Sequence, residues 1–400
     1  MILSFSYNNH AQNSVYGNVI YMADQHVAFS QLTWDRKIRS HDLLIGAALR
    51  YTYYDDNSPA TAYAFQGSTI NAPDAVYLPG LFIQDEITLN EKHKVLLGFR
   101  YDYNSRHGNI YTPRFAYKWA INENNILRFN AGTGFRVVNL FTEDHAALTG
   151  SRTVDVNSEL KPERSFNVNL NYAKKVYFED GGMINLDGSL FYTYFNNRII
   201  GDFDTDPNRI IYDNLDGYAV SRGISLNIDA AFRGGFKATI GGSLLDVFTR
   251  SPNQAKLLPV LTEKWTATWA MSYKIKPLNL TIDYTGNVYG PMRLPLLGDT
   301  DPRSKYSPVW SIQNIQFTYS GSKKMEMYLG IKNLLNFIPG RKDPFLIARS
   351  NDPFDKNVQY DTNNKVIATA DNPYGLTFDP NFVYAPNQGI RGFLGIRYSY

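Results

Sequence analysis

The sequence contains no cysteine and no long apolar run. The lack of cysteine excludes disulfide bonds, thiolate zinc sites and a cysteine nucleophile. No stretch of about 18 or more apolar residues occurs, so a membrane-spanning helix is excluded as well. The N-terminus, MILSFSYNNHAQNS, lacks the basic segment and the cleavage site of a signal peptide. We therefore expect that the true start lies upstream, or that the chain comes from a truncated gene or is a fragment.

Charged residues are scarce and nearly balanced, since 40 Lys and Arg against 37 Asp and Glu give a net charge of +3. Such a balance offers no electrostatic basis for binding nucleic acid, so no nucleic-acid partner is expected. Signatures of catalysis are also lacking: the sequence has no GxSxG elbow, no HExxH pair, no phosphate-binding loop and no dinucleotide fingerprint. We therefore expect that the protein is not an enzyme.

Aromatic residues, in contrast, are abundant, at 14% of the chain with 29 Tyr and 24 Phe. A soluble protein rarely holds so much tyrosine, because each hydroxyl needs water or a polar partner. A membrane β-barrel accommodates tyrosine in its two interfacial girdles, where the ring contacts lipid and the hydroxyl reaches the headgroups.

Apolar and polar residues alternate with a period of two, which is typical of β-strands. Between Arg164 and Tyr172, Phe, Val, Leu and Tyr alternate with three Asn, and 95–102, 224–232 and 278–285 repeat the pattern. Both soluble sandwiches and membrane barrels show such alternation, but spanning strands need about 9 to 11 residues against about 5 or 6 in soluble sheets. The longest predicted strands reach the larger value; they lie near 41–54, 93–104, 163–176, 181–196, 218–232 and 235–249. Their polar faces suit a wet lumen.

The links between the predicted strands alternate between short and long. Short links lie near 36–40, 90–92, 122–124, 179–182, 234–235, 274–277 and 320–323, and long ones near 55–79, 133–162, 197–217, 250–261, 291–307 and 334–390. Short periplasmic turns and long extracellular loops are typical of outer-membrane barrels. The sequence therefore predicts an all-β fold, a transmembrane antiparallel β-barrel with about sixteen strands, in contact with lipid in the outer membrane of a Gram-negative bacterium.

The chain ends in RGFLGIRYSY, where Leu394, Ile396, Tyr398 and Tyr400 share one face. This segment resembles the C-terminal strand signal of outer-membrane proteins, which implies the barrel-assembly machinery as a partner. An ordinary edge strand is the alternative, but an exposed apolar edge would invite aggregation of a soluble protein.

Six further segments resemble TonB-dependent receptors, in the order of that family. They are LPGLFIQDEITLNEKHKVLLGFRYDYN (78–104), TPRFAYKW (112–119), LRFNAGTGFRVVNLFTED (127–144), LKPERSFNVNLNY (160–172), DNLDGYAVSRGISLNIDA (213–230) and IKNLLNF (331–337). Each segment is short, but together with the terminal strand they cover most of residues 78–400. The resemblance implies an outer-membrane receptor and transporter for a scarce solute, such as an iron chelate, haem, cobalamin or another metal complex. It implies TonB and a metal-complex ligand as partners.

The sequence departs from this family in length. Members are expected to carry a TonB box, a plug domain and a barrel of about 22 strands. Residues 1–400 offer no TonB box and no room for a plug, so we expect the C-terminal part of such a barrel, with contact to TonB through the part that is missing. A plug-less, porin-like diffusion channel is the alternative, and an outer-membrane hydrolase using Asp144 and His145 is a third hypothesis.

Candidate ligand-binding residues lie in the link at 133–162, within and after FRVVNLF. They are Arg136, Asn139, Glu143, Asp144, His145 and Arg152. Acidic and histidine side chains could bind a metal, and the resemblance implies that a His in this loop could ligate haem. The alternatives are that Arg136 and Asn139 pin the loop after a strand at 124–132, and that the other residues form a solvated loop. His10 and His107 are also predicted to lie in loops.

Asp202, Asp204 and Asp206 have the alternating spacing of calcium-binding loops, although the Gly and the terminal Glu of an EF-hand are missing. Calcium bound in an extracellular loop is one interpretation, and a solvated turn is the other; no resident cofactor is expected otherwise. A strand is predicted to begin at KPER (161–164), and its charged side chains are predicted to form ion pairs in the lumen.

Overall fold

The computed structural model describes most of the chain. Its described residues are 1–16, 19–58, 61–65, 68–137, 153–156, 160–202, 205, 209–252, 255–294, 304–322, 324–339, 359–362, 366–370, 373, 384–386 and 388–398. Among these residues, no helix has the length and the apolar character that crossing a membrane requires.

Sixteen strands form one antiparallel sheet, in which each strand pairs with its neighbours in chain order. They are β1 (Ile2–Tyr16), β2 (Val19–Ile38), β3 (His41–Asp56), β6 (Asp74–Thr88), β7 (His93–Asn104), β8 (Gly108–Asn122), β9 (Asn125–Arg136), β11 (Glu163–Tyr177), β12 (Met183–Asn197), β15 (Tyr218–Ala231), β16 (Phe236–Arg250), β17 (Trp265–Ile275), β18 (Leu280–Tyr289), β19 (Trp310–Tyr319), β20 (Met325–Lys332) and β23 (Arg391–Tyr398). This arrangement confirms the predicted all-β fold and the predicted number of strands.

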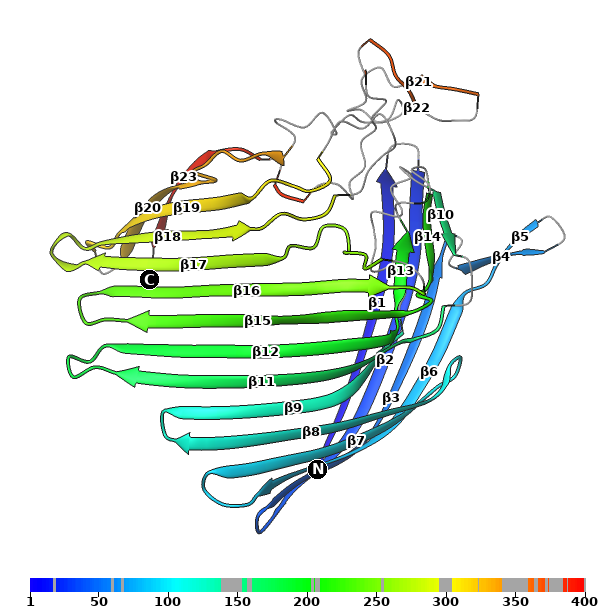
Figure 1. Cartoon of the computed structure of the whole chain (residues 1–400), viewed down its shortest axis with the longest axis horizontal. Coiled ribbons are helices and arrows are strands. Elements are labelled where there is room, and N and C mark those ends of the chain that lie inside the picture. The colour runs from blue at the N-terminus through cyan, green and yellow to red at the C-terminus, as the bar shows by residue number, and fades with distance from the viewer. Residues whose placement is uncertain are drawn as a thin grey trace.

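Short strands outside this sheet belong to the long links. They are β4 (Ala62–Phe65) with β5 (Ser68–Asn71), β10 (Thr153–Val156) with β14 (Arg209–Asn214) and β13 (Ile199–Asp202), and β21 (Gln359–Tyr360) with β22 (Val366–Ile367). All of them lie at one end of the sheet, while tight turns join the strands at the other end (Figure 1). One of those turns contains the short 3-10 helix η3 (Lys276–Leu278). The predicted alternation of short turns and long loops is thereby confirmed, and it places the long-loop end outside the cell.

The two faces of the sheet differ because side chains alternate along every strand. One face is apolar along the middle of the strands: Leu97 on β7 pairs with Phe115 on β8, and Leu190 on β12 pairs with Ile224 on β15. These side chains are exposed, with Leu97 at 50% and Ile224 at 51% of full exposure. An apolar face that stays uncovered in the folded chain is the face that contacts lipid. The opposite, polar face is the inner wall of the lumen.

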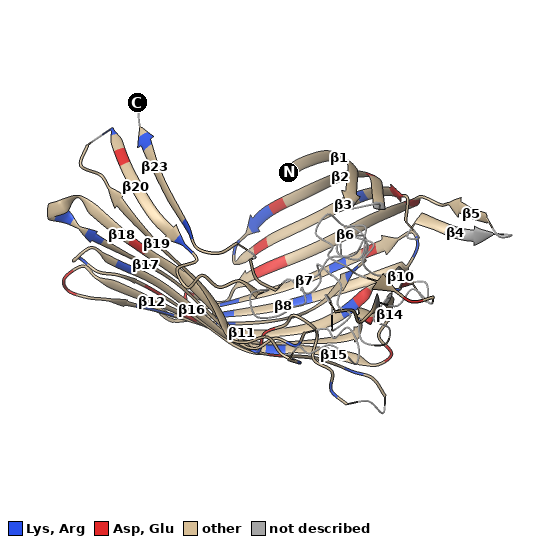
Figure 2. Cartoon of the chain, turned by 90° about the horizontal axis from the view of Figure 1, so that it is seen from above, with Lys and Arg blue, Asp and Glu red and all other residues tan. Residues whose placement is uncertain are grey.

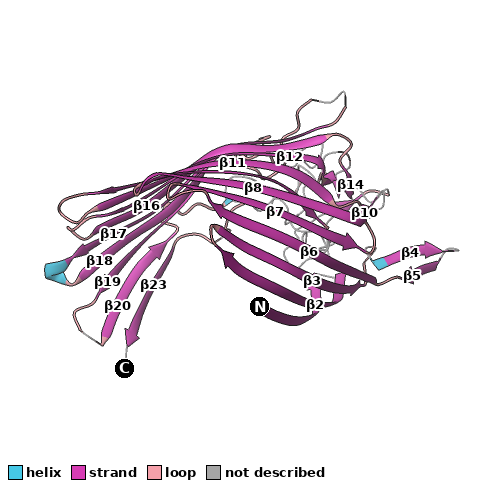
Figure 3. Ribbon diagram, turned by 90° about the horizontal axis from the view of Figure 1, so that it is seen from below, coloured by secondary structure: helices cyan, strands magenta, loops and turns pink. Residues whose placement is uncertain are grey.

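The sheet is strongly curved and remains open. Viewed along the molecule, β1 with the N-terminus and β23 with the C-terminus lie on opposite sides of a wide gap (Figures 2 and 3). Within the described residues, β1 pairs only with β2, and β23 pairs only with β20. The sheet thus forms a barrel wall with two unpaired margins rather than a closed cylinder.

Candidate functional site

The inner wall carries an arginine between two glycines. Arg114 on β8 lies between Gly98 on β7 and Gly132 on β9, and the same row continues to Gln84 on β6 and Asn167 on β11. Since a glycine has no side chain, the wall is hollowed on both sides of Arg114. The result is a groove of about 650 Å³, lined also by Arg100, Asn130 and Gly134.

Arg114 is the free cation of this groove. Its side chain is exposed, and it has no ion-pair or hydrogen-bond partner within the described part of the chain. A guanidinium offers five donors in a planar fork, which suits carboxylate and other oxygen-rich anions. The groove can therefore bind an anionic group of a solute in the lumen.

The neighbouring Arg100 is, in contrast, neutralised. Its Nε and Nη2 atoms donate to the two carboxylate oxygens of Asp102, over 2.7 and 2.6 Å. Asp102 is completely buried, beneath the partly exposed arginine, at a point where Gly80 leaves room for its carboxylate. This bidentate pair fixes the wall beside the groove and leaves Arg114 as the residue that attracts negative charge.

Arg136 is the one predicted ligand-binding residue of the 133–162 link that the structure describes. The prediction of a strand ending at 132 is wrong, because β9 continues to Arg136. There Nε of Arg136 donates to Oε2 of the buried Glu163 over 2.8 Å, and Oε1 of Glu163 accepts the backbone N–H of Ile199. This cross-strand pair prolongs β9 and anchors the start of β13, and the role of Arg136 in ligand binding stays a prediction.

The other residues predicted in that link, Asn139, Glu143, Asp144, His145 and Arg152, lie outside the described residues. Of the predicted calcium ligands, only Asp202 is described, and its Oδ1 accepts the backbone N–H of Thr205; Asp204 and Asp206 lie outside as well. No group of three or more His, Asp or Glu side chains able to hold a metal occurs among the described residues. The calcium site therefore stays a prediction.

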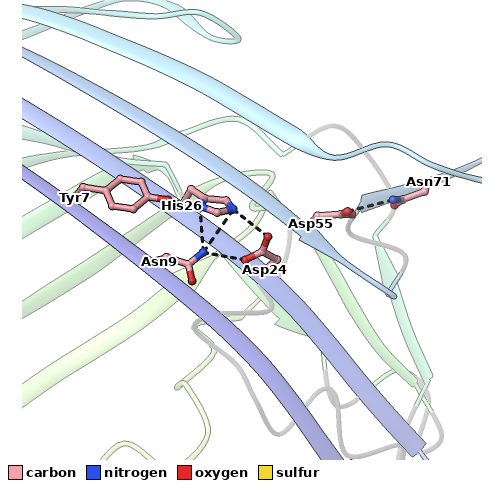
Figure 4. Close-up of polar contacts among 6 residues, drawn as sticks. All are labelled: Tyr7, Asn9, Asp24, His26, Asp55 and Asn71. Atoms are coloured by element: carbon pink, nitrogen blue, oxygen red, sulfur yellow. Dashed lines mark hydrogen bonds and ion pairs between the residues drawn. The ribbon is translucent and has the colours of Figure 1, made fainter.

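A polar cluster at the extracellular rim was not predicted. Tyr7 and Asn9 of β1 meet Asp24 and His26 of β2, with 2.7 Å between the Tyr7 hydroxyl and Nδ1 of His26, and 2.9 Å between Nε2 of His26 and Asp24 (Figure 4). The cross-strand contacts depend on the register of β1 against β2, which the sequence does not reveal. The prediction that His10 lies in a loop is wrong, because His10 lies within β1, whereas His107 lies in the β7–β8 turn as predicted.

Beside this rim cluster, the end of β3 meets the β4–β5 hairpin. Asn71 donates from Nδ2 to Asp55 over 3.3 Å (Figure 4). Asp24, Asp55 and Asn71 line a cavity of about 860 Å³ between the strand ends and the hairpin. The cavity is acidic, unlike the inner-wall groove around Arg114.

Comparison with known families decides the identity of the fold. Residues 2–334 match the family described as "TonB dependent receptor-like, beta-barrel". The chain belongs to this family. Its members are outer-membrane receptors and transporters of Gram-negative bacteria rather than enzymes, so the chain is an outer-membrane protein without a catalytic role.

Individual relatives are named as iron-regulated or siderophore-related outer-membrane proteins. An iron-regulated outer membrane virulence protein of Vibrio cholerae is 26% identical over 161 residues, which are 40% of this chain and 24% of that protein. Among solved structures, a ferric enterobactin receptor from Pseudomonas aeruginosa, in complex with enterobactin, superposes with a TM-score of 0.64 at 15% identity, covering 95% of this chain and 55% of that one. The siderophore receptor PirA from Acinetobacter baumannii gives a TM-score of 0.63 at 13% identity, covering 100% of this chain and 59% of the receptor.

The chain therefore spans little more than half the length of these solved receptors and about a quarter of the Vibrio protein. At such low identity the solved structures show the fold alone. Residues 2–334 include β1–β3, which precede all six of the sequence segments that resemble the family.

Proposed function

We propose that residues 1–400 form the C-terminal barrel wall of a receptor that takes up an anionic metal complex, energised through TonB in the complete protein. An iron chelate is the favoured class of solute, ahead of haem and cobalamin, because the names of the relatives describe them as iron-regulated or as siderophore receptors. The observation that carries the proposal for this chain is Arg114, an unpaired arginine in a glycine-lined groove of the inner wall.

The geometry supports transient binding of an anionic solute on its way through the lumen. A Cβ atom added at Gly98 or Gly132 would lie 3.6 Å from the Cβ or Cα atom of Arg114, so both positions leave the arginine accessible from the lumen. The surrounding groups are the amides of Gln84, Asn130 and Asn167, which can donate to oxygen atoms of a chelate. A single cation among neutral amides attracts an anion without holding it so strongly that passage stops.

Binding to the membrane-inserted chain tests this proposal. The chain would be titrated in vesicles with a ferric catecholate, a ferric hydroxamate, haem and cobalamin, with quenching of its tryptophan fluorescence as the signal. We expect saturable binding of at least one iron chelate, and about tenfold weaker binding in Arg114→Gln, because one charge-assisted contact is lost. The control Lys92→Gln, which changes a cation in the exposed periplasmic turn after β6, should bind like the unmodified chain.

Two results would contradict the proposal. One is that none of the four complexes binds saturably to a chain that has inserted and folded. The other is equal affinity of the Arg114→Gln variant and the unmodified chain, which would show that the groove does not contact the solute.

A further inference from the structure

The lipid-facing side of the sheet carries a set of cations near its extracellular margin. Arg222 on β15 and Asp246 on β16 are directly paired residues, and both side chains lie on the same face as the exposed Ile224 and Leu244. Charged side chains on this face are costly at the membrane midplane but not at the interface. Their height along the strands therefore decides what they contact.

Arg222 and Asp246 lie at the level of the outer headgroups. The nine residues from Gly223 to the periplasmic end of β15 at Ala231, and the ten from Phe236 to Leu245 on β16, are just enough to cross the hydrocarbon layer. Tyrosines surround this level: Tyr192 pairs with Arg222, and Tyr194 stacks on Tyr218 with 5.5 Å between the ring centroids. Such aromatic residues mark the boundary between hydrocarbon and headgroups.

A third charged residue reaches this place from a loop. The segment after β16 turns back, so that Leu257 pairs with Thr249 through two backbone hydrogen bonds. The turn brings Lys256 over the ring of Phe248, with 4.0 Å from Nζ to the ring centroid, and to 2.5 Å from Oδ1 of Asp246. Arg222 meets the other carboxylate oxygen over 2.9 Å. Two cations thus share one carboxylate, and a net positive charge remains.

Two further arginines extend the positive charge. By the alternation of their strands, Arg164 at the start of β11 and Arg250 at the end of β16 lie on the same outward face, where both are exposed, and neither has a partner among the described residues. The register puts each of them four residues, or about 13 Å, farther toward the extracellular end than Arg222. The alternation of β11, β12, β15 and β16 puts only one described carboxylate, that of Asp246, on the outward face of these strands. The predicted lumen ion pairs of 161–164 are thus found for Glu163 but not for Arg164, which faces outward.

We propose that Arg164, Arg222, Arg250 and Lys256, here called the outer basic patch, bind the phosphate groups of an anionic lipid in the outer leaflet. The charges are complementary, Arg222 and Lys256 lie at the height of the headgroups with Arg164 and Arg250 above them, and exposed Leu190, Ile224 and Leu244 lie below for the acyl chains. The partner is a phosphorylated membrane lipid rather than free phosphate, because only a lipid satisfies the cations and the apolar band together. This proposal is independent of the solute that the receptor carries.

Lipid retention measures this interaction. The purified full chain in neutral detergent would be mixed with a diphosphorylated glycolipid of the outer leaflet, with its dephosphorylated form, or with inorganic phosphate, and bound lipid would be counted by native mass spectrometry. We expect retention of the phosphorylated form only, with little displacement by millimolar phosphate. Removing a cation in Arg222→Gln or Lys256→Gln should weaken binding about fivefold, and the double variant more. Asp246→Asn should strengthen binding, since it removes the competing carboxylate.

The matched control is Lys174→Gln, because Lys174 is an exposed cation on the same face of β11 near the periplasmic end. The Lys174→Gln variant should retain the lipid like the unmodified chain. The charge-conserving double variant Arg222→Lys with Lys256→Arg should retain most of the lipid that the double Gln variant loses. Equal retention of both glycolipid forms, or no loss in the double Gln variant, would overturn the proposal. Ready displacement by inorganic phosphate would overturn the assignment to a lipid.

Discussion

Asp102 shows how a charged side chain is stabilised in the wall of this barrel. It is fully buried, and among the described residues its charge is balanced only by the bidentate contact with Arg100, which itself reaches the lumen. Asp102→Asn removes one charge-assisted bond and leaves a donor facing the guanidinium, so we predict a loss of about 2 kcal/mol in the free energy of unfolding. Urea titration of the membrane-inserted chain, followed by tryptophan fluorescence, measures this loss.

Asp42→Asn provides the comparison for Asp102. Asp42 contacts Lys37 over 3.9 Å across the periplasmic turn, and the lysine side chain is 73% exposed. An exposed pair of this kind contributes little, so the expected change is below about 0.5 kcal/mol. If the two Asn variants lost equal stability, the burial of Asp102 would not be the cause.

At the scale of elements, close strand contacts depend on glycine at particular positions. Gly223 in the middle of β15 faces the lumen, and a Cβ atom there would lie 2.4 Å from the carbonyl oxygen of Leu244 and 2.8 Å from the Phe191 ring. The carbonyl belongs to the sheet and cannot move alone. We predict that Gly223→Ala destabilises the chain by about 1–3 kcal/mol, through the strain of an overpacked site. The temperature at which the folded band is lost in gel electrophoresis reports this effect.

Gly392→Ala serves as the reference substitution in a strand. Gly392 lies in β23, and a Cβ atom there meets no other atom within 4 Å. Its replacement should therefore change stability by less than about 0.5 kcal/mol. A loss as large as that of Gly223→Ala would mean that strand glycines matter through backbone freedom and not through close contacts.

Most elements were predictable because a barrel strand carries its own pattern. The alternation at 93–104 and 218–232 predicted β7 and β15 to within a residue, since lipid and lumen each select one side-chain class. Contacts between distant segments were not predictable. Arg136 extends β9 because Glu163 lies opposite, and Lys256 reaches Asp246 because a loop turns back; neither pairing follows from a local pattern. The groove at Arg114 likewise depends on register, which aligns Gly98 and Gly132 with it.

At the scale of the whole molecule, charge divides the extracellular margin of the wall. Over β11–β16 the outer basic patch leaves a positive surface, whereas at the ends of β1–β3 Asp24 and Asp55 line an acidic cavity. One side of the wall thus favours anionic headgroups directly, and the other does not. A receptor with this uneven charge distribution would bind an anionic lipid along one part of its circumference and not along the other.

The open margins predict the behaviour of the isolated chain. β1 and β23 each expose a row of backbone N–H and C=O groups that have no partner within the described residues, and each such group costs several kcal/mol when it is unpaired in hydrocarbon, so water must enter along these margins of the inserted chain. We predict that the 400-residue chain gives no uniform single-channel conductance in planar bilayers. We also predict that every second amide of β1 exchanges with deuterium much faster than those of β11, which pair on both sides.

A porin-like channel would behave differently in both measurements. Sixteen is an even number of strands and is compatible with closure, in which case β1 would pair with β23 and both margins would disappear. Its signature is a reproducible conductance step together with protection of β1 equal to that of β11. A stable pore requires that the backbone amides at both margins are hydrogen-bonded, and pairing of β1 with β23 would provide those bonds. Conductance and amide protection must therefore change together, and their agreement decides between an open wall and a pore.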